Sequence, residues 1–236
     1  MSLTSEPDPV SKILKRRAAL AGLTVLVLAP LTLVSSAWAD TGKTVPATKV
    51  FPFLDAMLKV PPAERARIKV TYALRRDGKP VTGVKATLIE ASGARTPLPI
   101  DDQGRFERLP TLAQLQAKAQ LNLDLPADAK FGTAMLLDPV LKPAADYDAR
   151  ELVATVEESN GAIRKAAGAM ALMAPQMEGL AFLKAESGVA VFPNGSTKPL
   201  PAKAGTVVFE PDQFKGASRV RLAKAPSAVD YYDKKK

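Results

Sequence analysis

Apolar and polar residues alternate in short stretches through the first half of the chain. In residues 116–125, every second residue is Ala or Leu, and Lys, Gln, Asn and Asp stand between them. A period of two is typical of a strand that buries one face and exposes the other. The pattern predicts strands at residues 68–74, 84–88, 98–100, 105–109, 116–125 and 131–137. Turn residues separate these stretches, which favours an antiparallel β-sandwich-like region.

A short helix is predicted ahead of these strands, at residues 51–60. Its apolar side chains have helical spacing, and Pro52 suits an early helical position. This small amphipathic helix is expected to pack on the sandwich-like region. The preceding residues 40–50 are short, polar and Thr-rich, and are predicted to form a flexible linker. The apolar positions of the helix are Phe53, Leu54, Met57 and Leu58.

After residue 143 the pattern changes from strand to helix. Asp148 and Glu151 have the spacing of a capping box, so a helix is predicted to begin there and to continue through Glu158. The Ser-Asn-Gly sequence at residues 159–161 is expected to break or bend it. Residues 163–174 are rich in Ala and Met and predict a further helical stretch that ends before the next proline.

A period of two returns in the last fifty or so residues. Strands are predicted at residues 180–185, 188–192, 206–210 and 218–222, with Asn194-Gly195 as a hairpin turn. The tail, residues 225–236, ends with two tyrosines and three lysines, and its final residues are expected to be mobile. The expected class is α+β, mainly β: a sandwich-like half with a small helix before it, an Ala/Met-rich helical segment and a C-terminal antiparallel β-hairpin region. The two parts, residues 51–143 and 144–236, could be separate or share one core.

The first 39 residues have the pattern of an export signal. A basic stretch precedes an uncharged, mainly aliphatic run, and Ala37 and Ala39 stand at the two positions that signal peptidase reads. Asp40 is the expected mature N-terminus. An uncharged run of this length could also remain as an anchor, but Pro30 and the terminal Ala-Trp-Ala favour cleavage. Export through the Sec route to the periplasm is therefore expected.

The charge of the expected mature chain bears on its partners. Cleavage would leave 197 of 236 residues and remove four basic and two acidic side chains from 33 and 24, so the net charge becomes +7. This surplus favours anionic neighbours, which in the envelope are lipids or polymers, although the partner could equally be an envelope protein. Nucleic acid is not expected in that compartment, and any membrane association should be peripheral.

Two absences restrict the chemistry. The chain has no Cys and no His, which excludes disulfides, thiolate or imidazole metal sites, and Ser-His-Asp or Cys-His catalysis. It also contains no Ser-x-x-Lys or Gly-x-Ser-x-Gly motif. No catalytic residue, cofactor or metal ligand is therefore predicted. A hydrolase would have to use Asp, Glu, Ser or Lys alone.

The acidic stretch at residues 100–106, Ile-Asp-Asp-Gln-Gly-Arg-Phe, contains two carboxylates that could belong to a metal loop or to a catalytic pair. Asp101 and Asp102 are adjacent and not alternate, and strands are predicted on both sides, which argues against a calcium loop. Adjacent carboxyls also cannot face one another across a sugar. A hairpin turn is predicted, in which Gly104 provides a positive φ and Phe106 enters the core.

Part of the chain contains a Gly-Lys-Pro turn, a hydrophobic strand and an Asp-x-x-Gly-x-Phe hairpin, which are formed by Gly78-Lys79-Pro80, by residues 84–88, and by Asp101, Gly104 and Phe106. Residues 68–125 are similar to the transthyretin-like or carboxypeptidase-regulatory-like sandwich repeats of exported proteins, although the usual closing Gly-x-Tyr strand is replaced by residues 117–125. The resemblance implies a β-sandwich that serves as an adhesive or accessory module and not as a catalyst. No family resemblance is recognised in the remainder of the chain.

The Ala/Met-rich segment is the candidate binding feature. Its larger apolar side chains could line a lipid or acyl-chain pocket, because methionine adapts to irregular ligands. The competing interpretation is an ordinary core helix. The expected function is thus a non-catalytic envelope binding or accessory protein, with a periplasmic lipid-binding protein as the alternative. The candidate lining residues are Ile163, Met170, Met173 and Met177.

Overall fold

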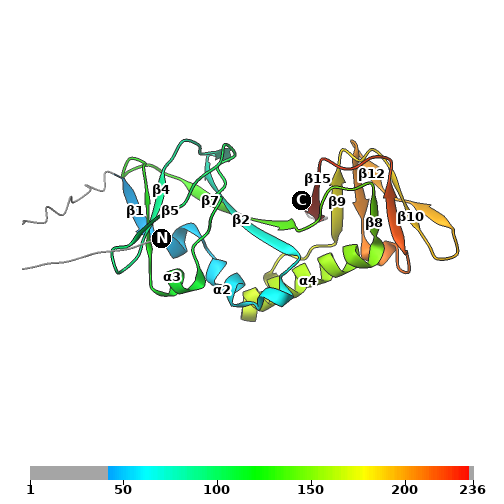
Figure 1. The fold of residues 1–236 in the computed structure, drawn as a ribbon, viewed down its shortest axis with the longest axis horizontal. Coiled ribbons are helices and arrows are strands. Elements are labelled where there is room, and N and C mark those ends of the chain that lie inside the picture. The colour runs from blue at the N-terminus through cyan, green and yellow to red at the C-terminus, as the bar shows by residue number, and fades with distance from the viewer. Residues whose placement is uncertain (1–41, 234–236) are drawn as a thin grey trace, which may run out of the picture. The chain divides into compact units, whose positions relative to one another are not determined.

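The computed structural model describes residues 42–233, which belong to one compact unit. Within them, the strands form four antiparallel sheets and one helix is long, so the predicted class, α+β and mainly β, is confirmed (Figure 1). The predicted signal with Ala37, Ala39 and Asp40 lies outside the described residues, as do the three final lysines. No helix in the described part of the chain is both long and apolar enough to cross a membrane.

Two sheets form the N-terminal half, with strand orders β1-β6-β4-β5 and β3-β2-β7. Alternating residues of both sheets enter one apolar cluster, where Tyr72, Leu88 and Leu121 are fully buried. This arrangement follows from the period-two pattern, because each strand has one apolar face to cover. The strands are β1 (Lys43–Pro46), β2 (Ile68–Arg76), β3 (Lys79–Pro80), β4 (Ala86–Ile89), β5 (Arg95–Pro97), β6 (Gln120–Leu123) and β7 (Gly132–Pro139).

The predicted linker at residues 40–50 contains regular structure. Strand β1 pairs antiparallel with β6, and the helical turn α1 (Ala47–Val50) buries its first and last residues. A strand of four residues is too short to show a clear period in the sequence. It forms because the edge of β6 is available and because Val50 and Phe51 reach the core.

The helix predicted at residues 51–60 is shorter than expected. It is α2 (Leu54–Lys59), and the single turn η1 (Pro62–Glu64) follows it. Phe53 precedes the helix with φ 64° and is 59% exposed, so the prediction that it lies on the buried helical face is wrong. Phe51 occupies the core instead, edge-on to Tyr72 and Phe106.

Three of the predicted N-terminal strands are also corrected. The strand expected at residues 116–125 is only β6, because α3 (Leu112–Gln116), which begins at a Thr111 capping box, extends to Gln116, and Lys118 then has φ 57°. Residues 105–109 form isolated bridges and no strand, and the strand expected at 98–100 lies earlier, as β5. At these sites, local hydrogen bonds of helix caps and turns formed in place of the strands that the period-two pattern predicted.

Two further sheets form the C-terminal half, with orders β11-β10-β14-β8 and β12-β13-β9-β15. The predicted hairpin turn is present: Gly195 has φ 82°, and the strands on either side of it pair. Residues 228–232 of the tail form a strand paired with β9, and the final lysines of the tail lie outside the described residues. The strands are β8 (Asp146–Asp148), β9 (Gly179–Leu183), β10 (Gly188–Val191), β11 (Thr197–Pro199), β12 (Ala202–Lys203), β13 (Thr206–Phe209), β14 (Arg219–Leu222) and β15 (Ala228–Tyr232).

The long helix α4 (Ala149–Ala167) begins as predicted, with the Asp148 carboxylate accepting the Arg150 N–H at 2.8 Å. The expected break at residues 159–161 is wrong, because the helix continues through them. The short helix η2 (Gly168–Met173) follows, and η3 (Pro211–Gln213) lies in a later loop. Helix α4 contacts β8, β9 and β14 and reaches α2 of the N-terminal half (Figure 1).

Three apolar clusters stabilise the described chain. One lies in each half, and a third, smaller cluster joins α2 and β2 to α4 through Met57, Val60, Ile68, Ala162 and Ile163. The sequence did not decide whether residues 51–143 and 144–236 share one core. In the structure each half has its own core, and the two halves share an apolar contact.

An ion-pair cluster lies at the same junction. Arg67 Nη1 and Nε bond Glu158 and Glu151 of α4 at 2.7 and 3.0 Å. The α4 helix is therefore attached to the start of β2 by charge as well as by apolar packing.

Candidate functional site

The four predicted lining residues do not line a common cavity. Ile163 is 6% exposed and Met177 is half-buried, and both belong to the cluster that joins α2, β2 and α4. Met170 and Met173 are 55% and 87% exposed on η2. Two of the residues therefore anchor the segment, while the other two project from it.

The exposed part of this segment is an apolar tip, which we define as Met170, Leu172 and Met173. Leu172 is fully exposed, and all three lie within the six residues of η2. Single exposed apolar residues are common on soluble proteins, but a group of large ones in one turn is typical of a contact surface. In the rest of the described chain, the large apolar side chains of comparable exposure are the separate Phe53 and Val140.

A side-chain clamp fastens the base of the tip. Asn160 Nδ2 donates to the Met177 carbonyl at 2.8 Å, and the Met177 N–H donates to Asn160 Oδ1 at 2.8 Å. The amide thus satisfies both backbone groups of Met177, as a neighbouring strand would do. These two bonds close residues 161–176 into a loop, so the chain is held in place on the C-terminal side of the tip.

The shape of the loop follows from its sequence. Gly168 has φ 54° and ends α4, because few other residues adopt this conformation without strain. The 3₁₀ turns of η2 then place consecutive side chains around the axis, so no single face can bury all of them. Pro175 prevents a further helical residue at Ala174, which is extended at ψ 147°.

The base of the tip is basic. Arg164 and Lys165 occupy the last turn of α4, and Lys59 comes from the last turn of α2. Residues 55–65 and 160–177 together contain four basic and two acidic side chains, a net charge of +2. Both lysines form exposed ion pairs, Lys59 with Asp55 at 3.5 Å and Lys165 with Glu64.

A small cavity lies between the two lysines, with a volume of about 310 Å³. Its wall combines the end of α2 with the end of α4, and its charged lining residues are the two lysines, each of which is paired with a carboxylate outside the lining. We call it the lysine cavity. Its lining residues are Ala56, Lys59, Val60, Pro61, Lys165 and Ala166.

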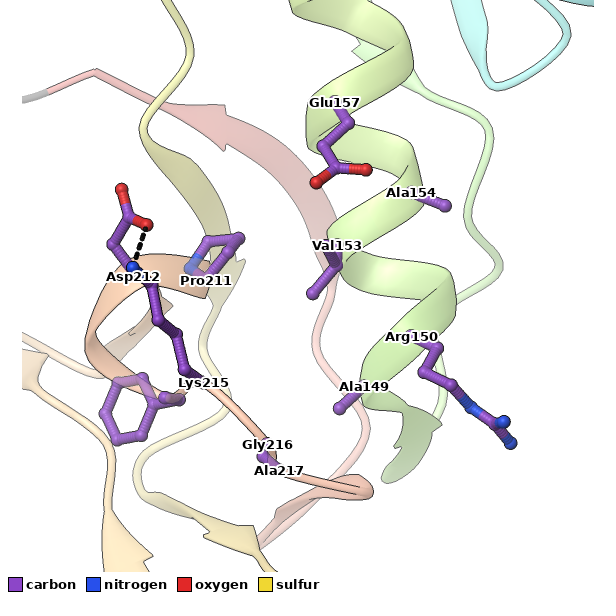
Figure 2. A pocket seen from close by; sticks show the side chains of 11 residues that line it. Ala149, Arg150, Val153, Ala154, Glu157, Pro211, Asp212, Lys215, Gly216 and Ala217 are labelled. Atoms are coloured by element: carbon purple, nitrogen blue, oxygen red, sulfur yellow. Dashed lines mark ion pairs between the residues drawn. The ribbon is translucent and has the colours of Figure 1, made fainter.

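A second cavity, of about 380 Å³, lies between the first turns of α4 and the loop that contains η3. Figure 2 shows Val153 and Glu157 directed towards the loop, whereas Arg150 points away from it. On the loop, Asp212 and Lys215 pair with each other at 3.3 Å. The charged lining residues, Arg150, Glu157, Asp212 and Lys215, include two of each sign, so the lining of this groove carries no net charge.

Several titratable groups have shifted pKa values, and each shift has a structural cause. Bonds from Glu151 and Glu158 raise the pKa of Arg67, and the N–H of Arg150 lowers the pKa of Asp148 at the helix N-terminus. Burial raises the pKa of Tyr231 to about 12. Its hydroxyl donates to the Arg67 carbonyl at 3.3 Å. Arg67 and Tyr231 support the junction between the two halves, Asp148 caps α4, and none of the three lines either cavity.

The acidic stretch at residues 100–106 forms the predicted turn. Asp101 Oδ1 accepts the N–H groups of Gln103 and Arg105 at 2.8 and 2.7 Å, Gly104 has φ 72°, and Phe106 is 3% exposed. In the described residues, no three acidic side chains lie close enough to hold a metal ion. The carboxylate of Asp101 is thus occupied by its own backbone.

Comparison with protein-family models, curated proteins and solved structures found no match. The candidate site therefore rests on the chain's own geometry. Sequence reasoning identified the methionines of the tip but missed the clamp of Asn160 and the paired Lys59 and Lys165. The position of Gly168 and Pro175 on either side of the apolar residues could have indicated an exposed turn, whereas the lysine pair depends on how α2 meets α4.

Proposed function

We propose that the protein is an exported, non-catalytic protein of the cell envelope that attaches peripherally to an anionic lipid surface. The observation that carries the proposal is the apolar tip, fastened by Asn160 and basic at its base. Export is inferred from the pattern of the first 39 residues, and the lack of Cys and His supports a binding role. The proposed compartment is the periplasm.

The expected free energies favour reversible attachment to the lipid surface. Full burial of a Leu or Met side chain contributes roughly 1.5–3 kcal/mol, and each basic residue near an anionic surface adds about 1 kcal/mol. Three inserted tip residues with Lys59, Arg164 and Lys165 behind them would offset the lost freedom of the protein. Apolar insertion and basic charge act together in interfacial binding, without a spanning helix.

The test is vesicle sedimentation with the mature chain, Asp40–Lys236, which is a compact unit. We expect it to bind vesicles of phosphatidylethanolamine and phosphatidylglycerol, and to bind less as salt rises, because salt screens the basic base. The double variant Leu172→Asp, Met173→Asp should lose this binding while keeping its circular dichroism spectrum. The matched control is Val140→Asp, which alters an exposed apolar residue elsewhere and should bind as the wild type does.

Two results would contradict the proposal. One is a wild-type chain that stays in the supernatant with every vesicle, and the other is a tip variant that sediments as well as the wild type. If the tip variant instead loses a stoichiometric envelope protein that co-purifies with the wild type, without any lipid binding, the tip is a protein-docking surface.

A further inference from the structure

We infer that the lysine cavity is a headgroup site, in which Lys59 and Lys165 hold the phosphate of an anionic phospholipid. The inference rests on the proposed function and specifies which lipid atoms the protein contacts beside the tip. The cavity and the tip are joined by α4: Lys165 and Ala166 line the cavity, and η2 begins at Gly168. A surface that receives the tip therefore lies close to the two ammonium groups.

The cavity has the composition of an anion site with an apolar side. Lys59 and Lys165 provide the charge, while Val60, Pro61 and Ala166 provide apolar wall. Its volume of about 310 Å³ lies at the lower end of the range for small-ligand sites. A phosphate carries charged oxygens for the ammonium groups, and the glycerol and acyl carbons attached to it suit the apolar wall.

Both lysines can exchange their present partners. The side chains of the Lys59–Asp55 pair are 58% and 44% exposed, and those of the Lys165–Glu64 pair are 57% and 42% exposed. Exposed ion pairs contribute little to stability, because water already solvates both charges. If a headgroup takes the ammonium groups, the two carboxylates remain solvated, so no buried charge is left without a partner.

A phospholipid suits the site better than a free anion. The phosphate of a lipid is attached to the surface that the tip enters, so the second contact forms at a high effective concentration. Inorganic phosphate has no such attachment and meets two lysines that are already paired. We therefore expect vesicle binding to depend on the lysines, and free phosphate to bind the soluble chain without saturation at millimolar concentrations.

The test compares two double variants of the mature chain on vesicles that contain phosphatidylglycerol. Lys59→Gln with Lys165→Gln should lower the partition coefficient about 25-fold, at about fivefold for each lysine. The control, Lys215→Gln with Lys224→Gln, removes the same charge from exposed lysines that are also ion-paired. It should change the coefficient by less than about threefold, because those side chains do not line the cavity.

The outcomes separate the inference from the proposed function. If the wild type binds through the tip but both lysine pairs reduce binding equally, the headgroup site is wrong and a general charge effect replaces it. Saturable binding of inorganic phosphate that is lost in the cavity variant would also overturn the lipid assignment, in favour of a free-anion site. If the wild type does not bind vesicles at all, the attachment itself fails.

Discussion

Asp101 has a carboxylate that could bind a metal ion or act in catalysis, but in the structure it stabilises a turn. Its carboxylate accepts two backbone N–H groups of its own turn, and Gly104 in the same turn donates to the Asp101 carbonyl at 3.0 Å. A Cβ at Gly104 would lie 2.9 Å from the Leu74 carbonyl oxygen, so the turn is also packed closely against β2. Asp102 is exposed and takes part in none of these contacts.

This asymmetry predicts different costs for the two acids. Asp101→Ala removes an acceptor from two backbone donors and should lower the free energy of unfolding by about 1 kcal/mol. Asp102→Ala alters an exposed side chain and should stay within about 0.5 kcal/mol of the wild type. Urea denaturation of both variants measures the difference. Equal losses would mean that Asp101 does not hold the turn.

The segment formed by α4 and η2 combines a rigid base with an exposed end. Asn160 lies within the helix, where asparagine is a poor helix former, yet its amide bonds a residue 17 positions later. The helix continues through residues 159–161 because Ser159 is buried and Asn160 directs its hydrogen bonds outward to Met177. Tertiary contact therefore overrides the local tendency of these residues to end a helix.

The clamp should be measurable as stability. Asn160→Ala leaves both backbone groups of Met177 without their partner and should cost about 1–2 kcal/mol, after a small gain in helix propensity. Amide exchange at the Met177 N–H should become faster than in the wild type. The control Gln176→Ala, an exposed residue of the same loop, should change neither quantity. Unchanged exchange at Met177 in the Asn160 variant would contradict the clamp.

The two halves of the molecule meet through apolar packing, ion pairs and one tyrosine. Tyr231, on the last strand, bonds the carbonyl of Arg67, whose guanidinium binds Glu151 and Glu158 of α4. The junction thus links the start of β2, the long helix and the C-terminal strand. Ionising Tyr231 would place a negative charge near Glu158, which is one reason that its pKa is raised, after burial.

This link predicts an alkaline weakening of the fold. The pKa of Tyr231 is about 12 in the folded chain against 10.0 ordinarily, so its stabilising effect is complete below pH 10 and is lost as pH rises towards 12. The wild type should therefore lose about 1–2 kcal/mol more than Tyr231→Phe over this interval, allowing for partial exposure. Urea denaturation at each pH gives the comparison. Parallel losses in the two proteins would show that Tyr231 is not the group responsible.

Local patterns were sufficient for much of this protein. The alternation of residues 68–74 predicted β2, the Asp148 cap predicted the start of α4, and Asn194-Gly195 predicted a hairpin turn, because each depends on neighbours along the chain. The absence of His and Cys likewise restricts the possible chemistry whatever the fold. The similarity of residues 68–125 to exported sandwich repeats stays a prediction.

Contacts between residues that are distant in the sequence account for the features that local patterns did not predict. Strand β1 exists because β6 has a free edge, α4 is continuous because Asn160 finds Met177, and Lys59 lies near Lys165 because α2 packs on α4. Composition showed that residues 163–174 were apolar, but burial is a property of the assembled chain and not of the segment. Folding covered Ile163 and left Leu172 exposed, since the 3₁₀ segment that begins at Gly168 cannot present all its apolar side chains to one core.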